Sequence, residues 1–256
     1  MPKLVKLLTD VLEQLQKQIT THQHEWTLQQ NPEALHSLRI CLRQLRSLLR
    51  PLRSELNEVI VLDQLAKEII TKTNCIRDIE VLILELKQRQ KPEIAMIYEQ
   101  KLQSSFLNIV QHLEFQSIIQ SLSHLSLSWQ KSISLNTAEK LEHHIAEDWQ
   151  KQSHKLFKLI QQNVPDKHQI RILIKHLRYH SEIYQKFLPK RAPQQTQQLK
   201  KLQDLLGTWH DYFVWLNDID QCQELVALEP IWREQLQYWE EKSDQALKKL
   251  KLKHFV

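Results

Sequence analysis

The chain has 256 residues, a formal net charge of +5 and a hydrophobic content of 41%, which suits a soluble globular protein with a sizeable core. Its single glycine, Gly207, excludes a glycine-rich phosphate loop and a dinucleotide-binding fingerprint, since both need several glycines beside phosphate. The same scarcity disfavours sheets, whose turns and bulges use glycine, and favours an all-α protein with short loops.

The hydrophobic periodicity is helical along nearly the whole chain. Helices are predicted over residues 3–29, 32–50, 55–71, 74–90, 92–118, 136–163, 167–188, 194–206, 208–226 and 230–253. Residues 121–136 hold six serines and are predicted to form a linker. Pro51 disfavours helical geometry at Arg50, so the second helix should kink or end there.

The cysteines and the chain ends bear on the cellular compartment. Cys41, Cys75 and Cys222 are odd in number and far apart, which suits neither a disulfide framework nor a zinc site. No apolar run approaches a membrane span, and the first residues become polar too soon for a signal peptide. We therefore expect a cytoplasmic protein that does not interact with membranes.

A dense row of cations lies on the second predicted helix. Because each residue turns an α-helix by about 100°, five basic residues fall within an arc of roughly 80°. We call this set the N-terminal cationic face: His36, Arg39, Arg43, Arg46 and Arg50. Leucines occupy the opposite side, and no acidic residue is interleaved at the i+4 positions that surface helices use for ion pairs.

A similar pattern returns 132 residues later. We call it the C-terminal cationic face: His168, Arg171, Lys175 and Arg178. With a shift of 133, Lys67 matches Lys200 and Asp78 matches Asp211. A repeat this long predicts two similar helical units, over residues 1–130 and 131–256, related by a pseudo-twofold axis.

The two cationic faces could either only contact solvent or bind a ligand. A charged helix face usually only meets water. Here the faces are almost purely cationic and occur twice, which favours binding of an anion with many charges. Arginine donates bidentate hydrogen bonds to phosphate oxygens, and His36 and His168 lie near helix N-termini, where backbone amides favour anions.

Other candidate groups have weaker patterns. Asp78 and Asp211 are interpreted as carboxylates that fix arginine rotamers, with general-base catalysis as the alternative. His143 and His144 are adjacent and do not share a helix face, so we expect no metal site and no cofactor. The lysine-rich segment 248–254 is either a solvated helix end or a further basic contact.

At these residues the sequence resembles the CHAD family, the conserved histidine α-helical domain. The family pattern His-x-x-Arg-x-x-x-Arg/Lys-x-x-Arg stands here at residues 36–46 and at residues 168–178, followed by Tyr179. A second signature follows each, at residues 74–78 and 202–211. Three positions depart from the pattern or the repeat: Asn74 replaces a glycine, His210 replaces an asparagine, and Glu182 stands where the first half has Arg50.

The resemblance implies two antiparallel helical bundles and the binding of inorganic polyphosphate in a basic groove or pore, with association with polyphosphate granules. We find no strand of a fused catalytic domain, so we expect a stand-alone, non-enzymatic binder. Ligand contacts are expected from both cationic faces together with Lys67 and Lys200. Supporting roles are expected for Arg77, Asp78, Tyr179, Gln203, His210 and Asp211.

Two alternatives from other functional classes stay open. A nucleic-acid-binding module is disfavoured because no aromatic platform interrupts the basic positions. A phosphate-transferring or hydrolysing enzyme is disfavoured because the faces carry no carboxylate cluster for metal ions. For a polyphosphate binder, Arg39→Glu and Arg171→Glu should weaken binding without loss of helicity, and affinity should rise as the pH falls through roughly 6.5.

Overall fold

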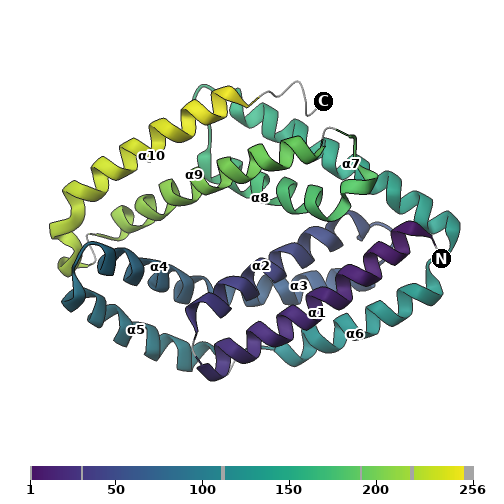
Figure 1. Cartoon of the computed structure of the whole chain (residues 1–256), viewed down its shortest axis with the longest axis horizontal. Helices are drawn as coiled ribbons and strands as arrows, with labels where there is room; N and C mark the ends of the chain where they lie inside the picture. The colour runs from purple at the N-terminus through teal and green to yellow at the C-terminus, as the bar shows by residue number, and fades with distance from the viewer. Residues whose placement is uncertain (1, 30, 111–112, 191, 220–221, 251–256) are drawn as a thin grey trace. The chain divides into compact units, whose positions relative to one another are not determined.

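The computed structural model describes residues 2–29, 31–110, 113–190, 192–219 and 222–250, and their regular structure is helical, with no strand (Figure 1). The α-helices are α1 Lys3–Gln29, α2 Pro32–Leu49, α3 Glu58–Lys72, α4 Asn74–Gln88, α5 Pro92–Val110, α6 Phe115–Ser132, α7 Leu135–Ile160, α8 Lys167–Tyr184, α9 Ala192–Asp218 and α10 Glu229–Lys249. The short 3₁₀ turns are η1 Arg50–Leu52, η2 Gln185–Phe187 and η4 Gln223–Leu228. The expected all-α class is confirmed. None of the described helices combines the length and the apolar character needed to cross a membrane.

Two compact units divide the chain. The first comprises Met1–Ile83 and Tyr98–Ala146, and the second comprises Leu84–Ile97 and Glu147–Val256. The boundaries fall inside α4, α5 and α7, so this division differs from sequence halves at residues 130 and 131.

The first unit contains a closed arrangement of four helices. Helix α1 packs on α2 and α6, and α3 packs on the same two helices (Figure 1). The leucine side of α2, including Leu38, Leu42 and Leu45, is fully buried in this arrangement. The opposite side of α2 therefore carries the N-terminal cationic face, as the periodicity predicts.

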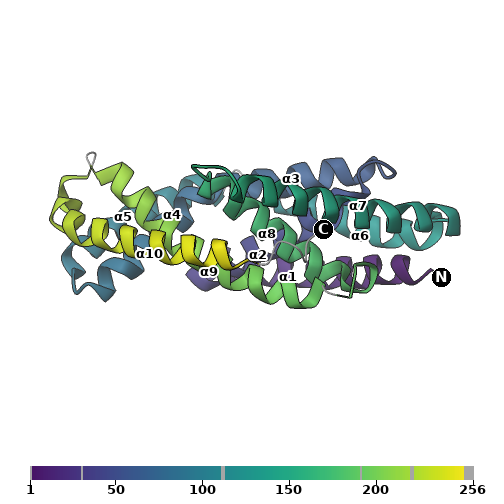
Figure 2. The same cartoon turned by 90° about the horizontal axis from the view of Figure 1, so that it is seen from above.

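In the second unit, α9 packs on both α8 and α10 (Figure 2). The core between these helices is rich in large side chains, with Ile174, Tyr184, Leu206 and Trp232 fully buried. The rings of Trp215 and Trp232 lie 5.2 Å apart. Burial of such large rings contributes strongly to the stability of this unit.

Side-chain caps set the start of both cationic helices. The backbone N–H of Glu33 donates to Asn31 Oδ1 over 3.0 Å, with Pro32 following the cap. The backbone N–H of Gln169 donates to Asp166 Oδ1 over 2.9 Å. At its other end α2 stops at Leu49 and passes into the 3₁₀ turn η1 at Pro51, as predicted.

The serine-rich segment was wrongly predicted to be a linker. Residues Phe115–Ser132 form α6, in which Leu122, Leu125 and Trp129 are buried. The Ser123 hydroxyl donates to a backbone carbonyl one turn back, which satisfies it without breaking the helix. The helix predicted over 92–118 ends at Val110, and the helices predicted over 194–206 and 208–226 form one helix, α9, that runs without a break through Gly207 and ends at Asp218. Residues 251–254 of the lysine-rich segment lie outside the described residues.

Candidate anion-binding site

The N-terminal cationic face has a graded exposure. His36, Arg43 and Arg46 are half-buried, and Arg50, in η1, is exposed. Arg39 is only 3% exposed, although it shares the same arc of the helix. The members of this face are therefore not equivalent as ligands for an anion.

Arg39 joins α2 to the end of α3. Its Nη1 donates to the Ile70 carbonyl over 2.7 Å and to Thr73 Oγ1 over 2.6 Å, and its Nη2 donates to Asn74 Oδ1 over 2.7 Å. Burial, with the nearby Arg43, lowers the pKa of Arg39 to about 10. The guanidinium thus bonds the carboxyl end of α3 and the start of α4, and this role is structural.

A carboxylate from a neighbouring helix pairs with the far end of the same face. Arg46 Nε donates to Asp63 Oδ1 over 3.0 Å, and Arg53 pairs with the other oxygen of Asp63. Asp63 lies on α3 and is 6% exposed. The spacing along α2 could not reveal this acid because it comes from another helix.

Arg77 of α4 extends the positive charge beside His36. Burial, followed by the charges of Arg77, Arg43 and Arg39, lowers the pKa of His36. Protonation of His36 is thus shifted below pH 6.5 in the unliganded protein. Of the other expected residues in this unit, Lys67 on α3 and Asp78 on α4 are exposed. The charge of Asp78 partly opposes the lowering of the Arg39 pKa by burial and Arg43.

Glu80 is an acidic neighbour of this face that the sequence interpretation missed. Arg77 Nη1 donates to Glu80 Oε2 over 3.1 Å, and Glu80 is 4% exposed. Burial raises the pKa of Glu80 to about 7, against the opposing effect of Arg77 and Arg39. Its carboxyl therefore titrates near neutral pH, and its protonated form leaves more net positive charge at this face than the residue types suggest.

On the second unit, His210 of α9 joins the C-terminal cationic face. The rings of His168 and His210 lie 5.4 Å apart. Burial, followed by the charges of Arg171, His168 and Lys175, lowers the pKa of His210 to about 4. His210 is therefore neutral near pH 7, and its buried Nδ1 has no hydrogen-bond partner within the protein.

The remaining residues expected in this unit differ in accessibility. Lys200 and His168 are exposed, while Arg171, Lys175, Gln203 and Asp211 are half-buried. The buried Gln203 Oε1 has no hydrogen-bond partner. Arg178 lies against the ring of the buried Tyr179, with Cζ 4.3 Å from the ring centroid, and its Nε is 3.7 Å from Glu182 Oε1. Arg178 is thus partly neutralised, as Arg46 is in the first unit.

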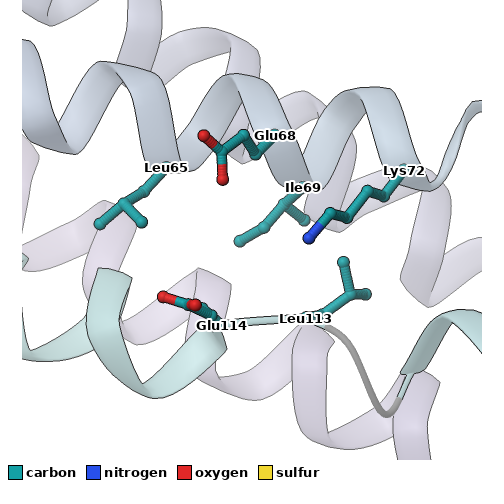
Figure 3. A pocket seen from close by; sticks show the side chains of 6 residues that line it. All are labelled: Leu65, Glu68, Ile69, Lys72, Leu113 and Glu114. Carbon is teal, nitrogen blue, oxygen red and sulfur yellow. The ribbon is translucent and has the colours of Figure 1, made fainter.

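Two pockets of the first unit do not suit a polyanion. The pocket in Figure 3, between α3 and the residues at the start of α6, has a volume of about 10 Å³, which is room for one water molecule. Its charged lining residues are the carboxylates of Glu68 and Glu114 and the ammonium group of Lys72, so acidic groups outnumber the basic one. A wider pocket of about 390 Å³ between α3 and α6 has Glu58 as its one formally charged side chain beside His124. The candidate anion-binding sites are therefore the two cationic faces, one on each unit.

Comparisons with known proteins agree on one family. The CHAD domain family model matches residues 10–217. The crystal structure of the CHAD domain from the plant Ricinus communis has a TM-score of 0.68 and 20% sequence identity to this chain, over 98% of this chain and 90% of that chain. No curated protein matches the sequence. With a family model that spans most of its length and a matching fold, the chain belongs to the CHAD family.

Proposed function

We propose that this protein binds inorganic polyphosphate through its two cationic faces and does not catalyse its turnover. One observation carries the proposal: the rings of His168 and His210 lie 5.4 Å apart, and the charges of Arg171, His168 and Lys175 add to the larger effect of burial in lowering the pKa of His210 to about 4. Holding like charges together costs folding free energy, and a bound polyanion would offset that cost. Membership of the CHAD family supports this ligand class. The expected location is the cytoplasm, at polyphosphate granules.

Linear polyphosphate suits a helix face that presents cations at steps of three and four residues. Such residues recur about every 5 Å along the helix axis, so an extended phosphate chain would meet a cation at each turn. The ligand offers no bases, and recognition would depend on charge density, arginine forks and counterion release. Affinity should therefore rise with chain length.

Charge-removing variants at half-buried positions test the proposal. Arg43→Gln in the first unit and Lys175→Gln in the second keep a polar side chain while deleting one charge each. Calorimetric titration with polyphosphate of defined length should show an affinity loss of about 5–10-fold for either variant. Exposed lysines of α7 supply matched controls, Lys140→Gln and Lys158→Gln, which should stay within about twofold of the parent protein. Equal losses in all four variants would indicate general charge attraction and contradict a specific site.

The absence of catalysis is part of the same proposal. Phosphoryl transfer usually depends on carboxylates that hold metal ions. We expect no Mg²⁺-dependent release of phosphate from polyphosphate. Metal-dependent turnover that disappears in Asp78→Asn or Asp211→Asn would assign those carboxylates to catalysis and overturn this part of the proposal.

Single-stranded nucleic acid is a second candidate, favoured by one aromatic feature beside the C-terminal cationic face. Phe213 is 40% exposed and stacks on Trp209, with ring centroids 5.3 Å apart. An exposed stacked ring can serve as a platform for a base. Loss of RNA binding in Phe213→Ala, together with failure of long polyphosphate to displace RNA at moderate salt, would favour this candidate.

A further inference from the structure

A buried cluster of one carboxylate and two imidazoles joins α7 to α8 in the second unit. Asp148 Oδ2 lies 3.1 Å from His176 Nε2 and 3.4 Å from His180 Nδ1. One donor atom from each residue lies within 4.8 Å of the other two. His180 is fully buried and His176 is 9% exposed. On α8 these histidines lie about 80° or more around the helix from the C-terminal cationic face, so the cluster is a separate feature.

We propose that Asp148, His176 and His180 form a binding site for a divalent transition-metal ion, with Zn²⁺ the best fit. Ligands at 2.0–2.1 Å from a tetrahedral Zn²⁺ lie about 3.3 Å from one another. The two distances from Asp148 Oδ2, 3.1 and 3.4 Å, fall on either side of that separation. Two histidines one helical turn apart with a carboxylate from a second helix are a ligand set that such ions use.

The hydrogen bonding of His180 points independently to a ligand. Its Nδ1 approaches Asp148 outside hydrogen-bond geometry, and neither ring nitrogen has a hydrogen-bond partner although the residue is fully buried. A buried polar atom left unsatisfied costs folding free energy. A metal ion bound to Nδ1 would use its lone pair and remove the cost at that atom.

Neighbouring side chains orient the proposed ligands. Gln152 Nε2 donates to the other carboxylate oxygen of Asp148, Oδ1, over 3.2 Å. Trp149 Nε1 donates to Ser181 Oγ over 3.0 Å, which fixes α7 against α8 beside the ligands. Outer partners of this kind are typical of protein metal sites. The Asp148 side chain is 18% exposed, so the cluster is accessible to an ion from solvent.

The alternative is a buried ion pair between Asp148 and a protonated histidine. Such a pair needs no metal, and its stability would not respond to Zn²⁺. A metal site would tie the carboxyl-terminal half of α7 to α8 and add stability when loaded. The two assignments therefore differ in metal stoichiometry and in thermal stability.

Cobalt titration of the full-length protein after EDTA treatment tests the proposal. We expect one Co²⁺ per chain with the intense visible bands of tetrahedral coordination, and displacement of Co²⁺ by Zn²⁺. At a Zn²⁺ concentration about a hundred times Kd, the midpoint of thermal unfolding should rise by roughly 5–10 °C. An absence of tetrahedral bands or an unchanged midpoint would assign the cluster to an ion pair and overturn the proposal.

Matched variants separate this site from general histidine–metal contact. His176→Gln and Asp148→Asn each remove one ligand with little change in size, and either should reduce Co²⁺ affinity at least tenfold. His154→Gln is the control, because His154 is an exposed histidine of the same helix α7. Circular dichroism shows which of the two ligand variants keeps the helix content of the parent protein, and Co²⁺ affinity is compared in that variant. Parental affinity in both ligand variants, or equal loss in His154→Gln, would contradict the proposal.

Discussion

At the scale of single residues, the N-terminal cationic face mixes two roles that helical spacing cannot separate. Arg39 and Arg43 share an arc of α2, yet Arg39 is buried on the end of α3 and Arg43 is half-buried. The periodicity of one helix gives the direction of a side chain but not its depth, which depends on where the next helix ends. The CHAD pattern could therefore be found in the sequence, whereas the structural role of Arg39 could not.

Arg39 variants should lose stability before they report on binding. Arg39→Gln removes charged hydrogen bonds to three acceptors, of which Thr73 is buried and Ile70 half-buried, and should lower the free energy of unfolding by about 3 kcal/mol. Urea denaturation followed by circular dichroism measures the loss. Arg43→Gln, as the matched control, should lose less than half as much. Full stability of Arg39→Gln would refute the structural role and restore Arg39→Glu as a test of binding alone.

Glu80 should make stability depend on pH in a defined window. Its folded-state pKa of about 7 lies above the ordinary value of 4.5, so the folded state binds this proton more tightly. The stabilising contribution is fully present below pH 4.5 and is lost as the pH rises through 7. Between pH 5 and pH 8 the stability of the parent protein relative to Glu80→Gln should fall by up to about 3 kcal/mol. A constant difference across this range would mean that Glu80 stays ionised throughout.

At the scale of helices, segments with a regular apolar repeat were predicted correctly. Breaks between helices that were predicted from serine or glycine content were wrong. Helix α1 was predicted with its observed bounds, Lys3–Gln29, because its apolar positions repeat without interruption. The serine-rich α6 was missed because serines such as Ser123 donate their hydroxyls to backbone carbonyls of the same helix, while Leu122 and Trp129 supply the buried side. Gly207 suggested a break, but α9 is packed on both α8 and α10, and this packing outweighs the low helix propensity of one glycine.

Gly207 is a site where the helix should gain stability. A Cβ added at this position would meet nothing within 4 Å, and the residue lies inside α9. Gly207→Ala should therefore raise the free energy of unfolding by about 0.5–1 kcal/mol, chiefly by restricting the unfolded chain. The midpoint of urea unfolding should shift upward with an unchanged m-value. A lower midpoint would show that α9 needs the conformational freedom of glycine there.

At the scale of the whole molecule, the distribution of charge matters more than its sum. The net charge is only +5, yet each unit holds its own cluster of cations on a helix face. Family and helical class could be inferred from the order of short motifs. The repeat predicted two units, but their boundaries could not be inferred, because these lie inside continuous helices that no composition change marks.

Salt should weaken polyanion binding in proportion to the contacts made. The logarithm of the association constant for long polyphosphate should fall linearly with the logarithm of salt concentration. Removing one contact, as in Lys175→Gln, should reduce the magnitude of that slope by about one. The slope of Lys158→Gln should match the parent protein. A parental slope in Lys175→Gln would place Lys175 outside the contact surface.

Because the pKa of Glu80 is about 7, binding of a polyanion at the N-terminal cationic face should be accompanied by proton uptake at this carboxyl. An anion bound beside Arg77 and His36 would add negative charge near Glu80 and raise its pKa further, so the complex should absorb protons from solution at pH 7. Calorimetry in two buffers of different ionisation enthalpy should then give different heats of binding for the same ligand. Glu80→Gln should reduce this buffer dependence of the binding heat when a short polyphosphate binds at the N-terminal cationic face. The buffer dependence should be the same in Glu80→Gln and the parent protein when the ligand binds at the C-terminal cationic face.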